Sequence, residues 1–267
     1  MGGRSIPSVP AGALAVILAA YGTIAPAQEM PERIEGRPNL NGVWQAIGTA
    51  HWNIEGHSAE ALPEFWQLGA IGAIPAGQSV VEGGNIPYLS EAIAVREENR
   101  AGWPANDPEA KCYQPGIPRA TYLPYPFRIV QGVGDILFAY EFASANRVVH
   151  MDERVPSPIE SYMGWSNGRW EGDTLVVEVT DFNGLTWFDR AGNHHSSALE
   201  VTERYTLAGP NHIDYEATIE DPNTFSRPWT ISMPLYRRVE DNAQVLEYKC
   251  VEFAEELLYG HLKKIEE

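Results

Sequence analysis

The sequence predicts a mainly β protein: an antiparallel up-and-down barrel with a helical insertion and a short C-terminal helix. Eight or more short β-rich runs follow one another, separated by turn residues and not by helices, which is typical of an antiparallel meander. A sheet of that length usually closes into a barrel or folds into a sandwich, because open edges invite pairing with other chains. The aromatic residues, 8 Trp, 12 Tyr and 8 Phe, are enough to fill a large core.

The first 27 residues have the pattern of a secretory signal peptide. Arg4 supplies the positive charge, Ala11–Gly22 supplies a short apolar run, and Ala25-Pro26-Ala27 supplies a cleavage site of small residues. The apolar run is short for a membrane span, so an uncleaved anchor is the less favoured alternative. We therefore expect a secreted or periplasmic protein whose mature part, residues 28–267, is a single barrel domain.

The first predicted strand is Gly42–Ala46, which follows a polar linker. Residues 55–101 differ in character, since Ala61–Leu68 and Pro87–Ala101 contain helix formers, with Ser90 as a candidate N-cap. Residues 102–126 contain six prolines, which leave no room for a regular element. The pattern predicts a helical insertion at about 55–101, packed on the barrel.

The remaining strands are predicted beyond residue 126, each bounded by turn residues. Their ranges are Phe127–Gln131, Ile136–Phe142, Arg147–Met151, Trp165–Trp170, Thr174–Thr180, Leu199–Leu207, Ile213–Glu220, Trp229–Arg238 and Gln244–Cys250. Side chains alternate between the two faces in Leu199–Leu207, and Glu203 stands on the otherwise apolar face. We expect this carboxylate inside the barrel. A short amphipathic helix is predicted at Phe253–Lys264.

The formal net charge of −17 argues against several partners. A surface of this sign repels the phosphate backbone of nucleic acids and anionic lipid headgroups. Stable membrane insertion is not expected, because no segment approaches the length of a transmembrane helix. The expected partner is a small organic substrate or ligand.

The two cysteines, Cys112 and Cys250, have one possible intramolecular pairing. Export to an oxidising compartment favours a structural disulfide between them. Two buried free thiols and a thiol nucleophile are the competing interpretations. Neither cysteine lies in a C-x-x-C pair, and an exposed thiol outside the cytoplasm would be open to oxidation.

Several stretches of the chain resemble known proteins. Gly42-Val43-Trp44 resembles the G-x-W motif in the first strand of lipocalin-like (calycin-type) barrels. Stretches over half the chain resemble a large group of secreted bacterial proteins described only as hypothetical: Lys111–Arg119, Gly168–Val177, Asp189–His195, Glu203–Tyr205 and Glu247–Cys250. The resemblance implies a common fold and a bridge between Cys112 and Cys250. It implies no activity, and the helical region 55–101 lies outside it.

The best candidate for a catalytic site is the loop from Asp181 to Ser197, since a loop of this length calls for a functional reason. Asp189 lies six residues before His195, near enough for a carboxylate to orient an imidazole. Glu203, inside the barrel on the next strand, would have a raised pKa suited to acid–base work near neutrality. His150 and Asp152 form a second imidazole–carboxylate pair.

Aromatic and cationic side chains near these residues are candidate substrate contacts: Trp187, Tyr205, Trp165 and Arg190. The structural alternative has Asp189 capping the loop, His194-His195 in a solvated turn, and Glu203 paired with Arg147, Arg169 or Arg204. A metal held by His150, His194 or His195 and one carboxylate is a further alternative that no spacing demands. We expect neither a metal nor a cofactor, because nucleotide-binding and metalloprotease motifs are missing.

Two functions follow from this pattern. The first is a cofactor-independent enzyme that uses His195 or His150 with Glu203 or Asp189 for acid–base chemistry in a barrel pocket, as a lyase, hydratase, isomerase or hydrolase. The second is a periplasmic, lipocalin-like binding protein for an apolar or aromatic ligand. The polar residues of the 181–197 loop favour the enzyme by a small margin, and the side chains that line the main cavity would discriminate between the two.

Overall fold

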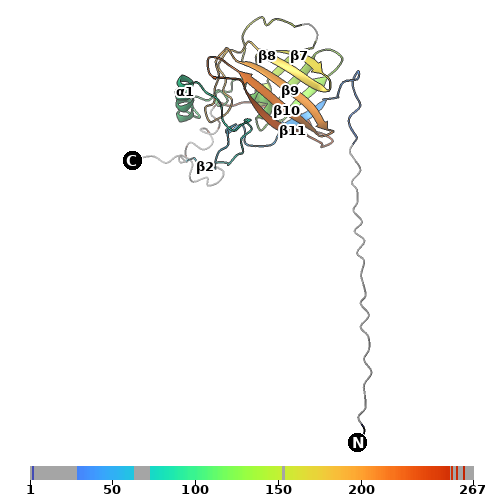
Figure 1. The fold of residues 1–267 in the computed structure, drawn as a ribbon, viewed down its shortest axis with the longest axis horizontal. Coiled ribbons are helices and arrows are strands. Elements are labelled where there is room, and N and C mark those ends of the chain that lie inside the picture. The colour runs from blue at the N-terminus through green and yellow to red at the C-terminus, as the bar shows by residue number, and fades with distance from the viewer. Residues whose placement is uncertain are drawn as a thin grey trace.

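Nine strands close into a barrel in the computed structural model, which describes residues 2, 29–62, 73–151, 154–252, 254, 257 and 261 (Figure 1). Around the barrel the order is β1-β11-β10-β9-β8-β7-β6-β5-β4, and β1 pairs with β4 to close it. The strands are β1 (Gly42–Ala46), β4 (Phe127–Gln131), β5 (Ile136–Tyr140), β6 (Asn146–His150), β7 (Trp165–Glu171), β8 (Thr174–Thr180), β9 (Glu200–Gly209), β10 (His212–Glu220) and β11 (Trp229–Arg237). The predicted mainly β barrel is confirmed.

One strand pair departs from the predicted antiparallel pattern. β6 and β7 run parallel, with Val149 opposite Ser166, and every other neighbouring pair in the barrel is antiparallel. The reason is arithmetical, because an odd number of strands cannot alternate in direction all the way round a closed ring. Residues 151–164 carry the chain back between the two parallel strands, as a parallel connection requires.

The predicted strand Gln244–Cys250 is wrong. This segment has no strand pairing, because β1 already pairs with both β11 and β4 and leaves no edge open to it. Instead the backbone N–H of Leu246 donates to the carboxylate of Glu141, and the ring of Tyr248 packs on Tyr125 and Phe142. We call residues 244–251 the C-terminal strap.

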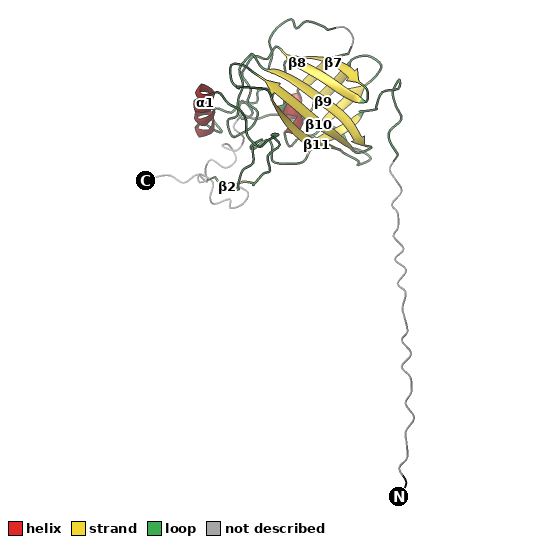
Figure 2. Ribbon diagram, viewed as in Figure 1, coloured by secondary structure: helices red, strands yellow, loops and turns green. Residues whose placement is uncertain are grey.

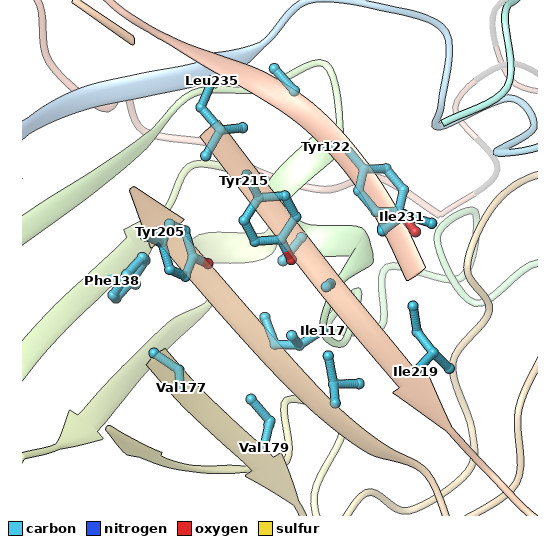
Figure 3. Close-up of a cluster of buried hydrophobic side chains, with 14 of the residues drawn as sticks. Ile117, Tyr122, Phe138, Val177, Val179, Tyr205, Tyr215, Ile219, Ile231 and Leu235 are labelled. Carbon is cyan, nitrogen blue, oxygen red and sulfur yellow. The ribbon is translucent and has the colours of Figure 1, made fainter. Parts of the chain in front are cut away.

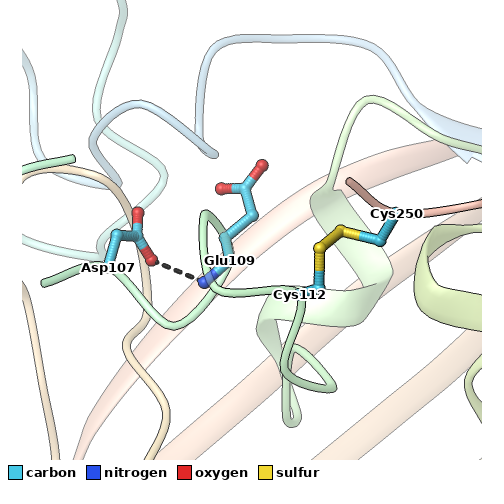
Figure 4. Close-up of a disulfide and its surroundings, with 4 residues drawn as sticks. All are labelled: Asp107, Glu109, Cys112 and Cys250. Carbon is cyan, nitrogen blue, oxygen red and sulfur yellow. Dashed lines mark hydrogen bonds between the residues drawn. A yellow bond between two sulfur atoms is a disulfide. The ribbon is translucent and has the colours of Figure 1, made fainter. Parts of the chain in front are cut away.

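The disulfide between Cys112 and Cys250 is confirmed, with an S–S distance of 2.01 Å and Cα atoms 5.6 Å apart (Figure 4). It joins the end of the strap to the proline-rich segment, close to Asp107 and Glu109. The signal peptide prediction and most of the predicted helices Ala61–Leu68 and Phe253–Lys264 fall outside the described residues.

The helical insertion is smaller than predicted within the described residues. It contains α1 (Ser90–Ala101), which begins after Leu89 and ends at Gly102, so Ser90 is the first helical residue and not the N-cap. The described part of 55–89 consists of turns and the short pair β2 (Glu60–Ala61) and β3 (Ala73–Ile74). Figure 2 shows α1 beside the barrel. None of the described helices is long and apolar enough to cross a membrane.

A short helix closes one end of the barrel, contrary to the expectation that the proline-rich segment holds no regular element. α2 (Arg119–Tyr122) and its flanks are buried, and Ile117, Ala120 and Tyr122 belong to the same core as the inward-facing side chains of the strands (Figure 3). The hydroxyl of Tyr122 donates to the carbonyl of Phe188. We call residues 47–126, which connect β1 to β4, the cap.

Gly164 illustrates how tightly the 151–164 connection packs. Its φ is +66°, and an added Cβ would lie 2.8 Å from the carbonyl oxygen of Thr180. Gly172 has a similar φ of +61° but open space around it. We expect Gly164→Ala to reduce the free energy of unfolding by about 1–3 kcal/mol more than Gly172→Ala, since only the first adds overpacking to backbone strain. Equal losses in urea unfolding would contradict this packing.

Candidate functional site

Glu203 lies inside the barrel, as its alternation predicts, but in a closed ion pair. Its carboxylate accepts hydrogen bonds from Arg147 Nη1 at 2.5 Å, Tyr205 at 2.7 Å and Tyr215 at 2.8 Å. Arg147 Nη2 in turn donates to the hydroxyl of Tyr205. These groups come from β6, β9 and β10, and all are buried. Both carboxylate oxygens are engaged within the barrel, so this geometry matches the structural alternative in which Glu203 pairs with Arg147 and not acid–base work with His195 in a barrel pocket.

The pair also fixes the charge state of its neighbours. Burial raises the pKa of Tyr205 and Tyr215 well above the usual value, and the charge of Glu203 adds to that effect. Burial opposes the charge on Arg147, but Glu203 outweighs it, so the pKa of Arg147 is raised. The tyrosines therefore stay neutral and the arginine stays charged, which makes this cluster a structural unit. Tyr205 is fully buried and its hydroxyl is bonded to Arg147 and Glu203, so this arrangement lends no support to its predicted role in substrate contact.

His195 is also enclosed. Its Nδ1 lies 2.8 Å from the carbonyl of Ser196, so Nδ1–H donates there and Nε2 accepts from the Thr186 hydroxyl at 2.7 Å. The ring packs against Phe182 and Phe188. Burial lowers the pKa of His195 to about 4, so the imidazole is neutral. Both ring nitrogens have partners, which leaves neither in position to take a proton from a ligand.

Asp189 does not orient an imidazole, contrary to prediction. Its carboxylate accepts hydrogen bonds from the backbone N–H groups of Ile54, Ala191 and Asn193 and from the side-chain amide of Asn193. Burial raises the pKa of Asp189 to about 6. The carboxylate of Asp189 therefore holds the 181–197 loop against the cap. This role resembles the structural alternative given above, in which Asp189 caps the loop.

The other predicted site residues are spread over the molecule. His150 Nδ1 lies 3.1 Å from Asp135, and Asp152 falls outside the described residues. Trp165 packs on His150 with ring centroids 4.9 Å apart. Trp187 is buried and pairs through its backbone with His194. The structure thus brings no two of the predicted catalytic residues together within the described part of the chain.

Buried imidazoles give a pH dependence to stability. Burial lowers the pKa of both His51 and His195 to about 4, whereas both would take up protons below 6.5 in the unfolded chain. Their contribution is therefore complete above pH 6.5 and lost as the pH falls towards 4. Asp189 acts oppositely: its pKa is raised from 3.8 to about 6, so its contribution is lost as the pH rises through that range.

Two histidines outweigh one aspartate, so we expect the free energy of unfolding to fall by about 3–4 kcal/mol between pH 6.5 and 4. Urea unfolding at several pH values measures this loss. His195→Gln should remove roughly half of the histidine contribution to the slope. A stability that does not change over this range would show that the imidazoles are not buried as described.

A cavity of about 260 Å³ lies at the capped end, outside the barrel interior. It is lined by Trp52, Asn53, His57, Glu60, Leu62, Ile74, Arg100, Trp103, Pro104, Arg190 and Ala191. The rings of Trp52 and Trp103 lie 5.7 Å apart and are inclined by 59°. We call it the tryptophan cavity. Arg190 and Ala191 come from the 181–197 loop, so this loop flanks the tryptophan cavity, but neither His195 nor Glu203 is among the lining residues.

Arg190 is held in place by a buried charge cluster behind the cavity. Its Nε and Nη2 both donate to the carboxylate of Glu109, at 3.1 and 2.7 Å. Glu109 also accepts from Arg119, which forms a bidentate pair with Asp107. Burial opposes the charge on Glu109, but Arg190 and Arg119 outweigh it and lower its pKa to about 2. The guanidinium of Arg190 lies 4.4 Å from the ring centroid of Trp52.

A second, smaller cavity of about 120 Å³ adjoins the first and shares Trp103, Pro104 and Arg190 with it. Tyr248 and Cys250 of the C-terminal strap form part of its wall. Trp52, Trp103, Asn53 and His57 were not among the residues predicted from the sequence. A usable signal was the run from His51 to His57, where an aromatic residue stands among polar ones directly after the first strand.

No cluster of three or more His, Cys, Asp or Glu side chains suited to a metal is found among the described residues. Three comparisons, with protein-family models, with curated proteins and with solved structures, find no match to this chain. The geometry of the tryptophan cavity is therefore the main indication of function.

Proposed function

We propose that the protein binds a small ring-shaped organic molecule in the tryptophan cavity. Ligand binding is the second of the two functions inferred from the sequence. Here the binding site is at the capped end and not in the barrel interior. The observation that carries the proposal is a cavity of about 260 Å³ with two tryptophan walls and a rim of hydrogen-bonding side chains. Binding sites commonly combine apolar aromatic walls with a few polar groups that orient the ligand.

The barrel interior supports this choice by being occupied by side chains. Phe127, Phe138 and Tyr215 are fully buried in one core with the cap residue Tyr122. The carboxylate of Glu203, the group best suited to chemistry there, is neutralised by Arg147. A ligand in the interior would have to displace these packed groups, whereas the tryptophan cavity needs no such rearrangement.

An acid–base enzyme is the second candidate, and His57 is the observation that favours it. His57 Nδ1 lies 3.0 Å from the carbonyl of Glu55, so Nδ1–H donates and Nε2 carries the lone pair. His57 lines the cavity, and its Nε2 has no hydrogen-bond partner in the described part of the chain, but this nitrogen is buried beside Gly77, so the imidazole must turn before a ligand in the cavity reaches it. In the enzyme candidate, His57 is the acid or base, which is the role predicted from the sequence for His195 or His150. Loss of turnover of a bound compound in His57→Gln, measured by mass spectrometry, would establish it.

Action outside the cytoplasm is part of the proposal. The Cys112–Cys250 disulfide supports it, because structural disulfides persist in oxidising compartments. From the sequence motifs alone, we also propose that this chain is related to the secreted bacterial proteins that it resembles and that have a lipocalin-like first strand.

Binding can be tested by calorimetry with benzyl alcohol, indole and methyl β-glucoside as ring probes. We expect at least one probe to bind wild-type protein and to lose about tenfold or more in affinity in Trp52→Ala and Trp103→Ala, since each removes a stacking wall. Trp165→Ala is the matched control, because Trp165 packs on His150 and is not a lining residue. Binding that is lost in Trp165→Ala and kept in the other two variants would contradict the proposed site.

A further inference from the structure

Asn53, a lining residue of the tryptophan cavity, has a side-chain amide whose orientation is fixed. Its Oδ1 accepts hydrogen bonds from the backbone N–H of Glu55 at 2.9 Å and from Nδ2 of Asn193 at 3.3 Å. A backbone N–H can only donate, so the amide atom that faces it must be the oxygen and not the nitrogen. Turning the amide round would set its NH2 group against the N–H of Glu55, donor against donor.

Asn193 is in turn held by a buried carboxylate behind the cavity wall. Asn193 and Asp189 are both fully buried, and Nδ2 of Asn193 donates to Asp189 at 2.6 Å. On its other side, Oδ1 of Asn193 accepts from the hydroxyl of Tyr88 at 3.1 Å. A carboxylate accepts and does not donate, so Nδ2 of Asn193 must face Asp189, and its second N–H is left for Asn53. The charge of Asp189 thus fixes the Asn53 amide through Asn193.

The side chains that line the cavity have donor groups without partners. Within the described residues, Nδ2 of Asn53 makes no hydrogen bond, and neither do the indole N–H groups of Trp52 and Trp103. These three residues form a half-buried group at the cavity. A ligand that leaves such donors unpaired loses affinity, whereas one that offers an acceptor gains it.

The acceptors and charges of the lining side chains are already engaged or turned away. Glu60 pairs with Arg100 at 2.8 Å where both are about half exposed, and Arg190 pairs with Glu109 at 2.7 Å. The Nε2 atom of His57 is buried. Each arginine of the lining is thus matched by a carboxylate, within a protein of net charge −17. The lining therefore favours an uncharged ligand that accepts a hydrogen bond.

Resting on the proposed function, we propose that the tryptophan cavity takes an uncharged ring compound with a carbonyl oxygen on or beside the ring, and that Asn53 selects it by donating from Nδ2 to that oxygen. The ligand ring packs against the walls that Trp52 and Trp103 form. Asn53 directly follows Trp52 in the chain, so the donor adjoins one of these walls. Only non-covalent contacts form in this step.

Two pairs of probes separate the acceptor from the ring and from charge. 1-Indanone and indole are flat bicyclic compounds of nearly equal size, but the first offers an acceptor and the second an N–H donor. In calorimetry on the whole protein we expect 1-indanone to bind about tenfold more tightly than indole, because indole would leave the Asn53 donor unpaired. Acetophenone should bind more tightly than benzoate, which has acceptor oxygens but carries a negative charge.

Asn53→Asp keeps an oxygen for Glu55 and Asn193 but presents a second oxygen in place of the NH2 group. The order of the first pair should therefore reverse, with indole bound more tightly than 1-indanone. Asn183→Asp is the matched control, because Oδ1 of Asn183 likewise accepts from a backbone N–H two residues later, that of Leu185 at 3.1 Å, and Asn183 is not a lining residue. This control should keep the wild-type order. If Asn53→Asp does not fold, as judged by circular dichroism, the order of the probes on wild-type protein still decides.

The outcomes separate the two proposals. Indole bound at least as tightly as 1-indanone, or benzoate more tightly than acetophenone, with binding lost in Trp103→Ala, would overturn this inference and keep the proposed function. The wild-type order retained in a folded Asn53→Asp would likewise overturn the selecting role of Asn53 alone. Failure of these probes, of benzyl alcohol and of methyl β-glucoside to bind at millimolar concentration would overturn both.

Discussion

Arg147→Met is expected to reduce the free energy of unfolding by about 3–5 kcal/mol, because it leaves the carboxylate of Glu203 buried without its counter-charge. Glu203 is fully buried, and within the described part of the chain its remaining hydrogen bonds come from the neutral hydroxyls of Tyr205 and Tyr215. Urea unfolding followed by circular dichroism measures the loss.

Two further variants make this result specific. Arg147→Met combined with Glu203→Leu should be more stable than Arg147→Met alone, since no charge is then buried unpaired. Arg154→Met breaks the exposed Arg154–Glu178 pair and should cost at most about 1 kcal/mol. If the two single arginine variants are equally stable, the interior ion pair is not closed as described.

Removing the disulfide has an expected effect of similar size. Cys112 and Cys250 are 138 residues apart, and closing so long a loop contributes about 5 kcal/mol through the entropy of the unfolded chain. We expect the double variant Cys112→Ser/Cys250→Ser to lose up to that amount. Replacing both cysteines avoids intermolecular pairing of a single remaining thiol.

The loss should be accompanied by local release of the C-terminal strap. Tyr248 packs on Tyr125 and Phe142, Leu246 donates through its backbone to Glu141, and no residue of the strap is fully buried. Amide exchange should therefore rise at residues 244–251 and stay low in β8 and β9. An unfolding midpoint that is unchanged in the double variant would contradict a stabilising role for the disulfide.

The strands were predictable because their signals are local. β1, β4 and β8 begin and end where the alternation and turn residues place them. The short helix α2 was not predictable from the sequence, because four residues between prolines show no helical period. Burial of Tyr122 in the tertiary structure decides their conformation. Tertiary context also explains why the strand predicted at Gln244–Cys250 does not form. Its residues have β propensity, but the closed barrel offers no free edge with which they could pair.

The site was less predictable, because its members are far apart in sequence. Alternation placed Glu203 inside the barrel, but nothing local shows that Arg147, 56 residues earlier, would meet it there. Trp52, Trp103 and Arg190 come together only once the cap folds over the end of the barrel. Among the predicted site residues that the structure describes, Arg190 alone lines the tryptophan cavity. The 181–197 loop mainly anchors the cap through Asp189.

The most direct test of a site at the capped end is the indole N–H spectrum of the protein labelled with ¹⁵N-tryptophan. The chain has 8 tryptophans, so the spectrum is simple, and Trp52→Phe and Trp103→Phe assign the two signals of interest. On addition of whichever ring probe binds in calorimetry, we expect the signals of Trp52 and Trp103 to shift while those of the core residues Trp44 and Trp229 do not. Shifts at Trp44 and Trp229 with none at Trp52 and Trp103 would place the ligand in the barrel and contradict the account.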